Sequence, residues 1–217
     1  MNKTKSLLPF LLLTITTTIF TSCNDDEPTP DPIVSTTISN FAADPSTGFN
    51  PNTGAPIGST GKFAFFSFKT GAKVDNADSA TTKWDIGFRG TTIIVNSPTS
   101  GPGTSFVQVV SGIFDQLDNA PADGYKADDK NAAIKYAIPT GSGNGWYTAT
   151  GGAPGTPTII KPIAGRIIAV KTSDNRYAKM ELLSYYKDAP SNPTGSEQSR
   201  YYTFRYVYQP NDTKSFK

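Results

Sequence analysis

The sequence predicts a single all-β domain over residues 35–217, built mainly from antiparallel strands, and three observations support this. The chain of 217 residues contains 19 glycines and 17 prolines, well above average usage, which favours turns. Aromatic residues make up 12% of the chain and favour strands. No stretch keeps a helical period, whereas two-residue alternation and short apolar runs recur between turn residues. The length fits one large all-β domain, and the chain has no internal repeat and no second domain.

Residues 1–22 have the pattern of a bacterial lipoprotein signal peptide. Lys3 and Lys5 precede an apolar stretch over residues 6–20, which is shorter than a membrane-spanning helix needs. Cys23 is the only cysteine and directly follows a small residue at the end of this stretch, an arrangement that resembles a lipobox. We therefore expect lipidation of Cys23, which holds a protein durably on a membrane. The alternatives are an ordinary secretory signal with an incidental cysteine and an uncleaved anchor.

Residues 23–34 are predicted to form a tether between the anchor and the domain. Their acidic cluster at residues 24–27 resembles the export signal that sends some Gram-negative lipoproteins to the cell surface, and a plain solvated tether is the alternative. Regularly spaced prolines make the tether extended and stiff. We expect a lipid-anchored, surface-exposed protein of the outer membrane. Loss of residues 1–22 removes two of the 20 basic residues and none of the 18 acidic ones, so no basic field remains to recruit nucleic acid.

The first half of the domain contains four predicted strand segments and one helical turn. Residues 84–89 alternate between apolar and polar side chains, which predicts a half-buried strand with one wet face. Trp84, Ile86 and Phe88 form its apolar face. An aromatic strand is predicted over residues 62–69, and the alternating strand continues over 91–96. A further strand is predicted over 105–110 and a helical turn over 112–118.

Residues 119–157 are the loosest part of the predicted domain. They are rich in glycine, aspartate and proline, and a long segment of this kind in a compact domain is usually functional or disordered. The segment also carries an apolar run over residues 134–138 and the aromatic pair Trp146 and Tyr147.

Three further elements complete the predicted domain. The apolar runs at residues 158–161 and 166–171 flank a turn-forming segment at 162–165. This pattern predicts a hairpin with the two runs as its strands. A turn at residues 174–175 leads into a strand over 176–186, and the last strand covers 200–209. Alternation places one set of side chains on one face of the first of these two strands: Ala178, Met180, Leu182 and Tyr186. On the last strand it places another set on one face: Tyr202, Phe204, Tyr206 and Tyr208. Tyr185 falls on the opposite face of its strand.

The composition excludes several kinds of active site. The chain has no histidine, so it contains no Ser-His-Asp or Cys-His machinery and no imidazole ligand for zinc or haem. A single cysteine excludes internal disulfides, cysteine-rich zinc sites and iron–sulfur clusters. The run of residues 58–62 suggests a phosphate loop, but Pro56 and Phe63 stand where that motif needs glycine and a hydroxyl residue.

The carboxylates suggest two further kinds of site, a calcium site and a hydrolase site, with less support. Asp123, Asp128 and Asp129 are candidates for structural calcium, although the spacing of a calcium-binding helix–loop–helix motif is absent. Glu181 is the acid that a hydrolase would use, but Lys179 lies two residues away on the same strand face, which favours a charge pair across strands. We expect neither an enzyme nor a metal centre.

Four stretches that occur in order along the predicted domain carry a family resemblance. They read FFSFK, KWDIGFRGTTI, RYAKMELLSYYKD and RYYTFRY, at residues 65–69, 83–93, 176–188 and 200–206. Together, behind a lipobox, they resemble the HmuY family of bacterial surface haem-binding lipoproteins. The resemblance covers about residues 60–209.

This resemblance implies a hand-like all-β fold in which finger and thumb loops hold haem in a cleft. It also implies a protein that takes haem from host carriers and passes it to an outer-membrane receptor. The iron ligands of characterised members are two histidines or two methionines, in loops that correspond here to about residues 120–165. That region contains no histidine, methionine or cysteine, so the family's ligands do not carry over.

Four aromatic residues of this region are the candidate ligand-binding residues: Tyr125, Tyr136, Trp146 and Tyr147. A tyrosinate binds ferric haem in some proteins, but a phenol needs a nearby cation or the iron itself to lose its proton. Met180 is a further candidate axial ligand, although its position in a strand beside Leu182 favours the core.

Two functions of different kinds follow from the sequence. The first is a surface protein that binds haem or a related porphyrin by aromatic stacking and apolar burial, alone or with one tyrosine ligand. The alternative is a lipoprotein of the same fold that binds a non-haem ligand or a protein partner through residues 119–157. A hydrolase that depends on Glu181 has the least support.

Overall fold

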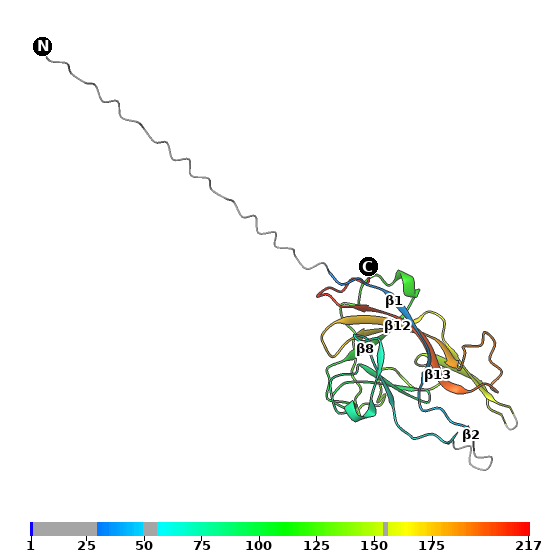
Figure 1. Ribbon diagram of the computed structural model, residues 1–217. Coiled ribbons are helices and arrows are strands. Elements are labelled where there is room, and N and C mark those ends of the chain that lie inside the picture. Colours follow the sequence, from blue (N-terminus) through cyan, green and yellow to red (C-terminus); the bar gives the residue numbers. More distant parts are fainter. Residues whose placement is uncertain (2–29, 50–55, 154–155) are drawn as a thin grey trace. The chain divides into compact units, whose positions relative to one another are not determined.

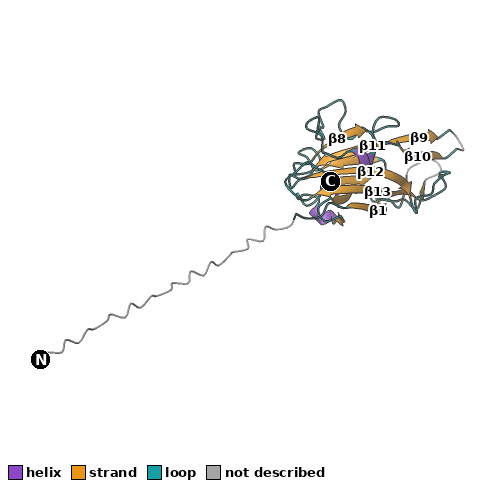
Figure 2. Cartoon of the chain, turned by 90° about the horizontal axis from the view of Figure 1, so that it is seen from above, coloured by secondary structure: helices purple, strands orange, loops and turns teal. Residues whose placement is uncertain are grey.

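The computed structural model describes residue 1, residues 30–49, 56–153 and 156–217. Its strands pair in antiparallel fashion, and its helical structure among these residues consists of short 3₁₀ turns. The all-β prediction is therefore confirmed. Five strands form the largest sheet, which Figure 2 shows side by side, in the order β1 (Ser35–Ala42), β13 (Ser199–Gln209), β12 (Tyr177–Tyr186), β11 (Arg166–Lys171) and β8 (Phe106–Ser111).

A second sheet of four strands packs against the first. Its order is β5 (Ala72–Val74), β4 (Ala64–Ser67), β6 (Ile86–Arg89) and β7 (Thr92–Val95). The ribbons β2 (Gly48–Phe49) with β3 (Pro56–Ile57), and β9 (Tyr147–Gly151) with β10 (Thr158–Pro162), complete the strands, which Figure 1 shows in sequence colours. The 3₁₀ turns are η1 (Asn76–Asp78) and η2 (Phe114–Gln116), and η2 confirms the predicted helical turn. No helix among the described residues is long and apolar enough to cross a membrane.

The main core fills the space between the two sheets and is dominated by aromatic rings. Phe66 of β4 lies 5.1 Å from Phe204 of β13, and Phe88 of β6 lies 4.8 Å from Tyr202, measured between ring centroids. The hydroxyl of Tyr202 donates to the Gly90 carbonyl at 2.7 Å, which joins the sheets by a polar contact as well. Such rings supply large apolar area and favourable edge-to-face contacts. The predicted inward face of the last strand is confirmed.

The prediction of a wet face for residues 84–89 holds at Arg89, which is exposed, but is wrong at Asp85 and Gly87, which are buried. Asp85 is only 4% exposed, because its carboxylate accepts the amides of Phe68 and of Ser173 in the loop after β11. Gly87 is buried beneath a second apolar cluster. This cluster, which we name the outer cluster, consists of Phe65, Trp84 and Ile94. Trp84 precedes β6 and packs there, at 4.4 Å from the Phe65 ring, instead of with Ile86 in the main core.

The predicted hairpin between residues 158–161 and 166–171 is also wrong. β10 pairs with β9, whereas β11 pairs with β8 and β12. The intervening residues cross from the ribbon to the sheet, and their anchors are the hydrogen bonds from the Ile163 amide to the Trp146 carbonyl and from the Gly112 amide to the Gly165 carbonyl. Short turn-like segments of this kind do not reveal from sequence alone which strands they connect.

β12 departs from simple alternation near its end. Its pairing with β13 shifts register between Leu182 and Ser184 and again between Ser184 and Tyr186. Such irregularities re-aim side chains. Tyr185, which was predicted on the face opposite Tyr186, therefore joins it in the main core.

Candidate functional site

The structure places three of the sequence-predicted site residues in the main core. Trp146 is 2% exposed and its indole N–H donates to the Thr91 carbonyl at 3.0 Å. Tyr147 is 7% exposed and packs beside Trp146, with the two rings tilted and their centroids 4.9 Å apart. Met180 has no exposed surface. In this conformation Trp146 and Met180 offer almost no surface to a ligand.

Tyr125 lies apart from that group, beside β12. Its ring centroid is 6.3 Å from that of Tyr177, which packs against a smaller cluster around Phe114 and Val207. The Tyr125 hydroxyl is buried and has no hydrogen-bond partner among the described residues. Burial raises the pKa of this hydroxyl, which opposes the formation of a tyrosinate.

Tyr136 is the candidate that lies at hollows on the surface. It is half-buried against the outer cluster and lines three neighbouring hollows of about 550, 570 and 680 Å³. These volumes are in the range of small-molecule pockets. Ile134, two residues earlier in the chain, is 64% exposed at two of these hollows, so an apolar side chain faces solvent where a ligand would lie. The structure therefore does not gather the four aromatic candidates at one site: Trp146 and Tyr147 pack together in the main core and only Tyr136 lines these hollows.

The largest of the three, which we name the aromatic hollow, has a wall that sequence reasoning missed. Phe63, Phe65 and Ile94 line it together with Tyr136. The rings of Phe63 and Phe65 are nearly parallel, with centroids 6.5 Å apart and an interplanar angle of 29°. The guanidinium of Arg89 lies 4.3 Å above the Phe63 ring, a cation–π contact. Strand alternation in the FAFFSF run gives this wall, because Phe63 and Phe65 face away from the main core.

A buried carboxylate fixes the segment that carries Tyr136. Asp128 is 3% exposed and accepts hydrogen bonds from the amides of Val95 and Ala137, at 2.9 and 2.8 Å. It also accepts from the Ser100 hydroxyl at 2.7 Å. One side chain therefore ties together β7, the 98–102 loop and the residue after Tyr136. Since its oxygens are engaged by these donors, Asp128 acts as a structural acceptor here rather than as the calcium ligand considered from sequence.

Glu181 has a structural partner as well. It lies opposite Arg205 in the β12–β13 pairing and forms an ion pair with it. The expected cross-strand charge pair is therefore present, but with Arg205 instead of Lys179. The ammonium of Lys179 donates instead to the carbonyls of Phe114 and Leu117, at 2.7 and 3.0 Å, the first residue of η2 and the residue that follows this turn.

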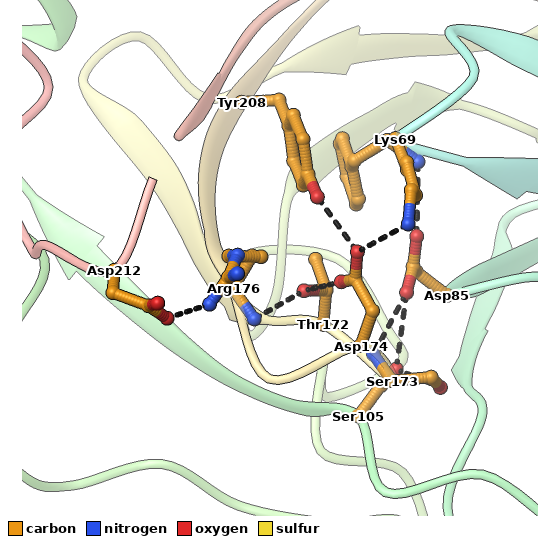
Figure 3. A network of polar contacts seen from close by, with 10 residues as sticks. Lys69, Asp85, Ser105, Thr172, Ser173, Asp174, Arg176, Tyr208 and Asp212 are labelled. Atoms are coloured by element: carbon orange, nitrogen blue, oxygen red, sulfur yellow. Dashed lines mark hydrogen bonds and ion pairs between the residues drawn. The ribbon is translucent and has the colours of Figure 1, made fainter. Parts of the chain in front are cut away.

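A polar network at the start of β12 is a second feature that alternation did not predict (Figure 3). Asp85 accepts the amide hydrogens of Phe68 and Ser173 at 2.9 and 3.0 Å, and burial raises its pKa to about 6. The neighbouring Asp174 accepts from the hydroxyls of Thr172 and Tyr208, at 2.6 and 2.7 Å.

The charges in this network are largely compensated. Lys69 lies 3.6 Å from the Asp174 carboxylate, and Arg176 forms an ion pair with Asp212. Burial acts to raise the pKa of Asp174, but its hydrogen bonds and the nearby Lys69 charge together lower it. The network borders a cavity of about 580 Å³, and its contacts fix the turn between β11 and β12 to the second sheet. We interpret it as structural.

Comparison with known proteins identifies the family to which this chain belongs. The family model described as HmuY protein matches residues 59–206, which is most of the chain. The chain belongs to the HmuY family. The resemblance seen in four sequence stretches is thereby confirmed, and the match includes every residue that lines the Tyr136 hollows. HmuY-like proteins are binding proteins rather than enzymes.

Solved structures similar to this chain include relatives from several bacteria. A HmuY-like protein from Bacteroides vulgatus ATCC 8482 shares 16% identity, covering 82% of this chain and 93% of its own, with a TM-score of 0.48. The apo HmuY analogue of Tannerella forsythia shares 18% identity, covering 82% and 96%, with a TM-score of 0.42. Apo PinO from Porphyromonas gingivitis shares 17% identity, covering 82% and 98%, with a TM-score of 0.41. No protein with a curated description matches the chain.

Proposed function

We propose that this HmuY-family chain is a lipid-anchored outer-membrane protein that binds haem or a related porphyrin at the hollows around Tyr136. The family match over residues 59–206 carries the proposal, because the family is associated with haem binding. The geometry supports it, since the half-buried Tyr136 lines all three hollows, with two phenylalanines at one of them and an exposed isoleucine at the other two. Aromatic faces and apolar side chains are what a flat apolar ring needs for stacking and burial.

The anchor part of the proposal depends on Cys23, which lies outside the described residues. Its position after an apolar stretch and a small residue, and the acidic residues that follow, support lipidation and export to the surface. We expect the wild-type chain to fractionate with outer membranes and to be digested by protease added to intact cells. Cys23→Ala should release it from the membrane fraction, and a variant that stays membrane-bound would count against the anchor.

The binding part is tested by titrating the purified protein with haemin and recording ultraviolet–visible spectra. We expect a saturable change in the Soret band, and Tyr136→Ala should weaken binding by about tenfold, since stacking on one aromatic residue is worth on the order of 1 kcal/mol. Tyr201→Ala is the matched control, because Tyr201 is also half-buried but lies on β13, outside these hollows.

A flat titration with both ferric and ferrous haem would reject haem binding. The chain would then be better described as a lipoprotein of this fold that recognises a non-haem ligand or a protein partner, and deletion within residues 119–157 would locate that contact. An outer-membrane receptor belongs to the haem proposal as the acceptor of the ligand, and a pull-down with loaded protein tests it.

A further inference from the structure

The sequence leaves open whether a porphyrin would be held by stacking alone or also by a bond from one tyrosine to the iron. We propose that the aromatic hollow recognises the porphyrin ring and its carboxylates and does not ligate the metal. The ligand class is therefore a planar apolar ring with carboxylate arms, with or without iron. This inference rests on the proposed function.

The first step concerns the available iron ligands. Haem iron in proteins is held by histidine, methionine, cysteine or tyrosine. The chain contains no histidine, Cys23 is its only cysteine, and its one internal methionine, Met180, is fully buried in the main core. Tyr136 is thus the one residue of these types among those that line the three hollows.

The second step concerns how Tyr136 is placed. Its ring packs against the outer cluster of Phe65, Trp84 and Ile94, so the aromatic face is part of an apolar wall. Tyr125 and Tyr147 pack elsewhere and supply no second oxygen on the opposite side of a ligand. Phe63 and Phe65 extend the wall with nearly parallel rings. Phe65 is 6% exposed and backs the wall, so the ring surface open to a ligand belongs to the half-buried Phe63 and Tyr136. Stacking on such rings does not depend on a metal.

Arg89 places a positive charge beside the aromatic wall. Arg89 holds its guanidinium over the Phe63 ring and donates to the Gly61 carbonyl at 3.0 Å. It forms no ion pair with a carboxylate among the described residues. A guanidinium that is oriented by stacking and still has N–H donors is suited to bind a carboxylate. Porphyrins of the haem type carry two propionates, so this cation complements the ligand's arms at the wall where the ring would stack.

The test compares haemin with protoporphyrin IX, the same ring without iron, under identical conditions. Binding is followed by quenching of Trp84 fluorescence in Trp146→Phe protein, because Trp84 lies directly against Phe65 at 4.4 Å. We expect the two dissociation constants to differ by less than about tenfold, which corresponds to less than about 1.4 kcal/mol. Haemin binding that is tighter by that factor or more would overturn the inference while leaving the proposed function intact, whereas absence of binding by both would overturn both.

Three variants locate the contacts. Tyr136→Phe keeps the ring and should leave both affinities and the Soret position unchanged; a shifted Soret band with weaker haemin binding would reveal an iron bond and overturn the inference. Arg89→Gln should weaken both ligands by about tenfold, as expected for a lost charge-assisted contact, and Arg89→Lys should restore part of this. Arg166→Gln is the control, because Arg166 lies on β11 of the other sheet, whereas Arg89 lies over the Phe63 ring that lines the hollow.

Binding of protoporphyrin IX dimethyl ester distinguishes the contribution of the porphyrin ring from that of its two carboxylates. The ester should bind wild type and Arg89→Gln equally, since it carries no carboxylate for the guanidinium. Equal loss for the free acid and the ester in Arg89→Gln would contradict the role of charge. It would indicate damage to the wall instead.

Discussion

Asp85 is the residue whose burial has the clearest thermodynamic consequence. It sits in a strand segment that alternates regularly, yet its carboxylate is 4% exposed and accepts amides from two other segments of the chain. Burial raises its pKa from 3.8 to about 6, despite these hydrogen bonds. The folded protein therefore keeps this proton over a pH range in which the unfolded chain has lost it.

The sign of the pH dependence follows. The stabilising contribution of Asp85 is complete below about pH 4 and is lost as the pH rises to about 6, a change of about 3 kcal/mol in the free energy of unfolding. Asp85→Asn is neutral throughout, so the stability of wild type relative to this variant should fall over that interval. Urea unfolding at several pH values measures it.

Asp129→Asn is the control for this pH series, because Asp129 is an exposed carboxylate in the same half of the domain. Its stability difference from wild type should not show the same fall. If the profiles of wild type and Asp85→Asn run parallel between about pH 4 and 6, Asp85 ionises as freely in the folded state as in the unfolded chain, and its assigned burial effect is wrong.

At the scale of elements, the long strands were predictable and their partners were not. β12 and β13 have alternating sequences and appear where the sequence predicts them, with Phe204 and Tyr206 facing the main core. β1 was missed because its side chains are mostly polar and exposed, so pairing with β13 rather than burial of a face defines it. The false hairpin at residues 158–171 failed for a related reason, since local sequence does not encode which distant strand supplies the hydrogen bonds.

The candidate site was only partly predictable for the same physical reason. The loose segment predicted over residues 119–157 is confirmed only in part, because residues 119–146 form no strand but Tyr147–Gly151 form β9. Tyr136, one of the candidates in that segment, lies at the hollows. The aromatic wall from Phe63 and Phe65 lies some 70 residues earlier in the chain, and only tertiary packing brings it to Tyr136. Trp146 looked equally available in sequence, yet its indole serves the contact between the ribbon end and the second sheet.

A buried carboxylate, that of Asp128, anchors the 133–139 segment at the Ala137 amide, which gives a prediction at this scale. Asp128→Asn retains one acceptor oxygen and introduces an N–H₂ group toward amide donors, so at least one buried donor near Val95 or Ala137 loses its partner. We expect a loss of about 1–3 kcal/mol in the free energy of unfolding, and weaker haemin binding because two walls of the hollows lose their common anchor. Asp129→Asn again serves as the exposed neighbour. Unchanged affinity in a destabilised Asp128→Asn protein would separate this carboxylate from ligand binding.

At the scale of the whole molecule, the two sheets share their stabilising contacts. The main core draws aromatic residues from both, and Tyr202 and Trp146 each donate a hydrogen bond to a carbonyl in the segment that joins β6 to β7. Neither sheet therefore retains a complete apolar interior without the other. A domain with one such interior is expected to unfold in a single cooperative step.

The two tryptophans allow that expectation to be measured. Trp146 lies in the main core and Trp84 in the outer cluster on the far side of the four-stranded sheet, and the chain has no others. In Trp146→Phe and in Trp84→Phe, the remaining tryptophan fluorescence and the far-ultraviolet circular dichroism should give coincident urea transitions within each variant, even though the midpoints of the two variants differ. If Trp84 fluorescence changes at lower urea than the circular dichroism, the outer cluster opens before the main core. The wall of the aromatic hollow would then be a separate, weaker unit, and porphyrin binding should raise the first transition more than the second.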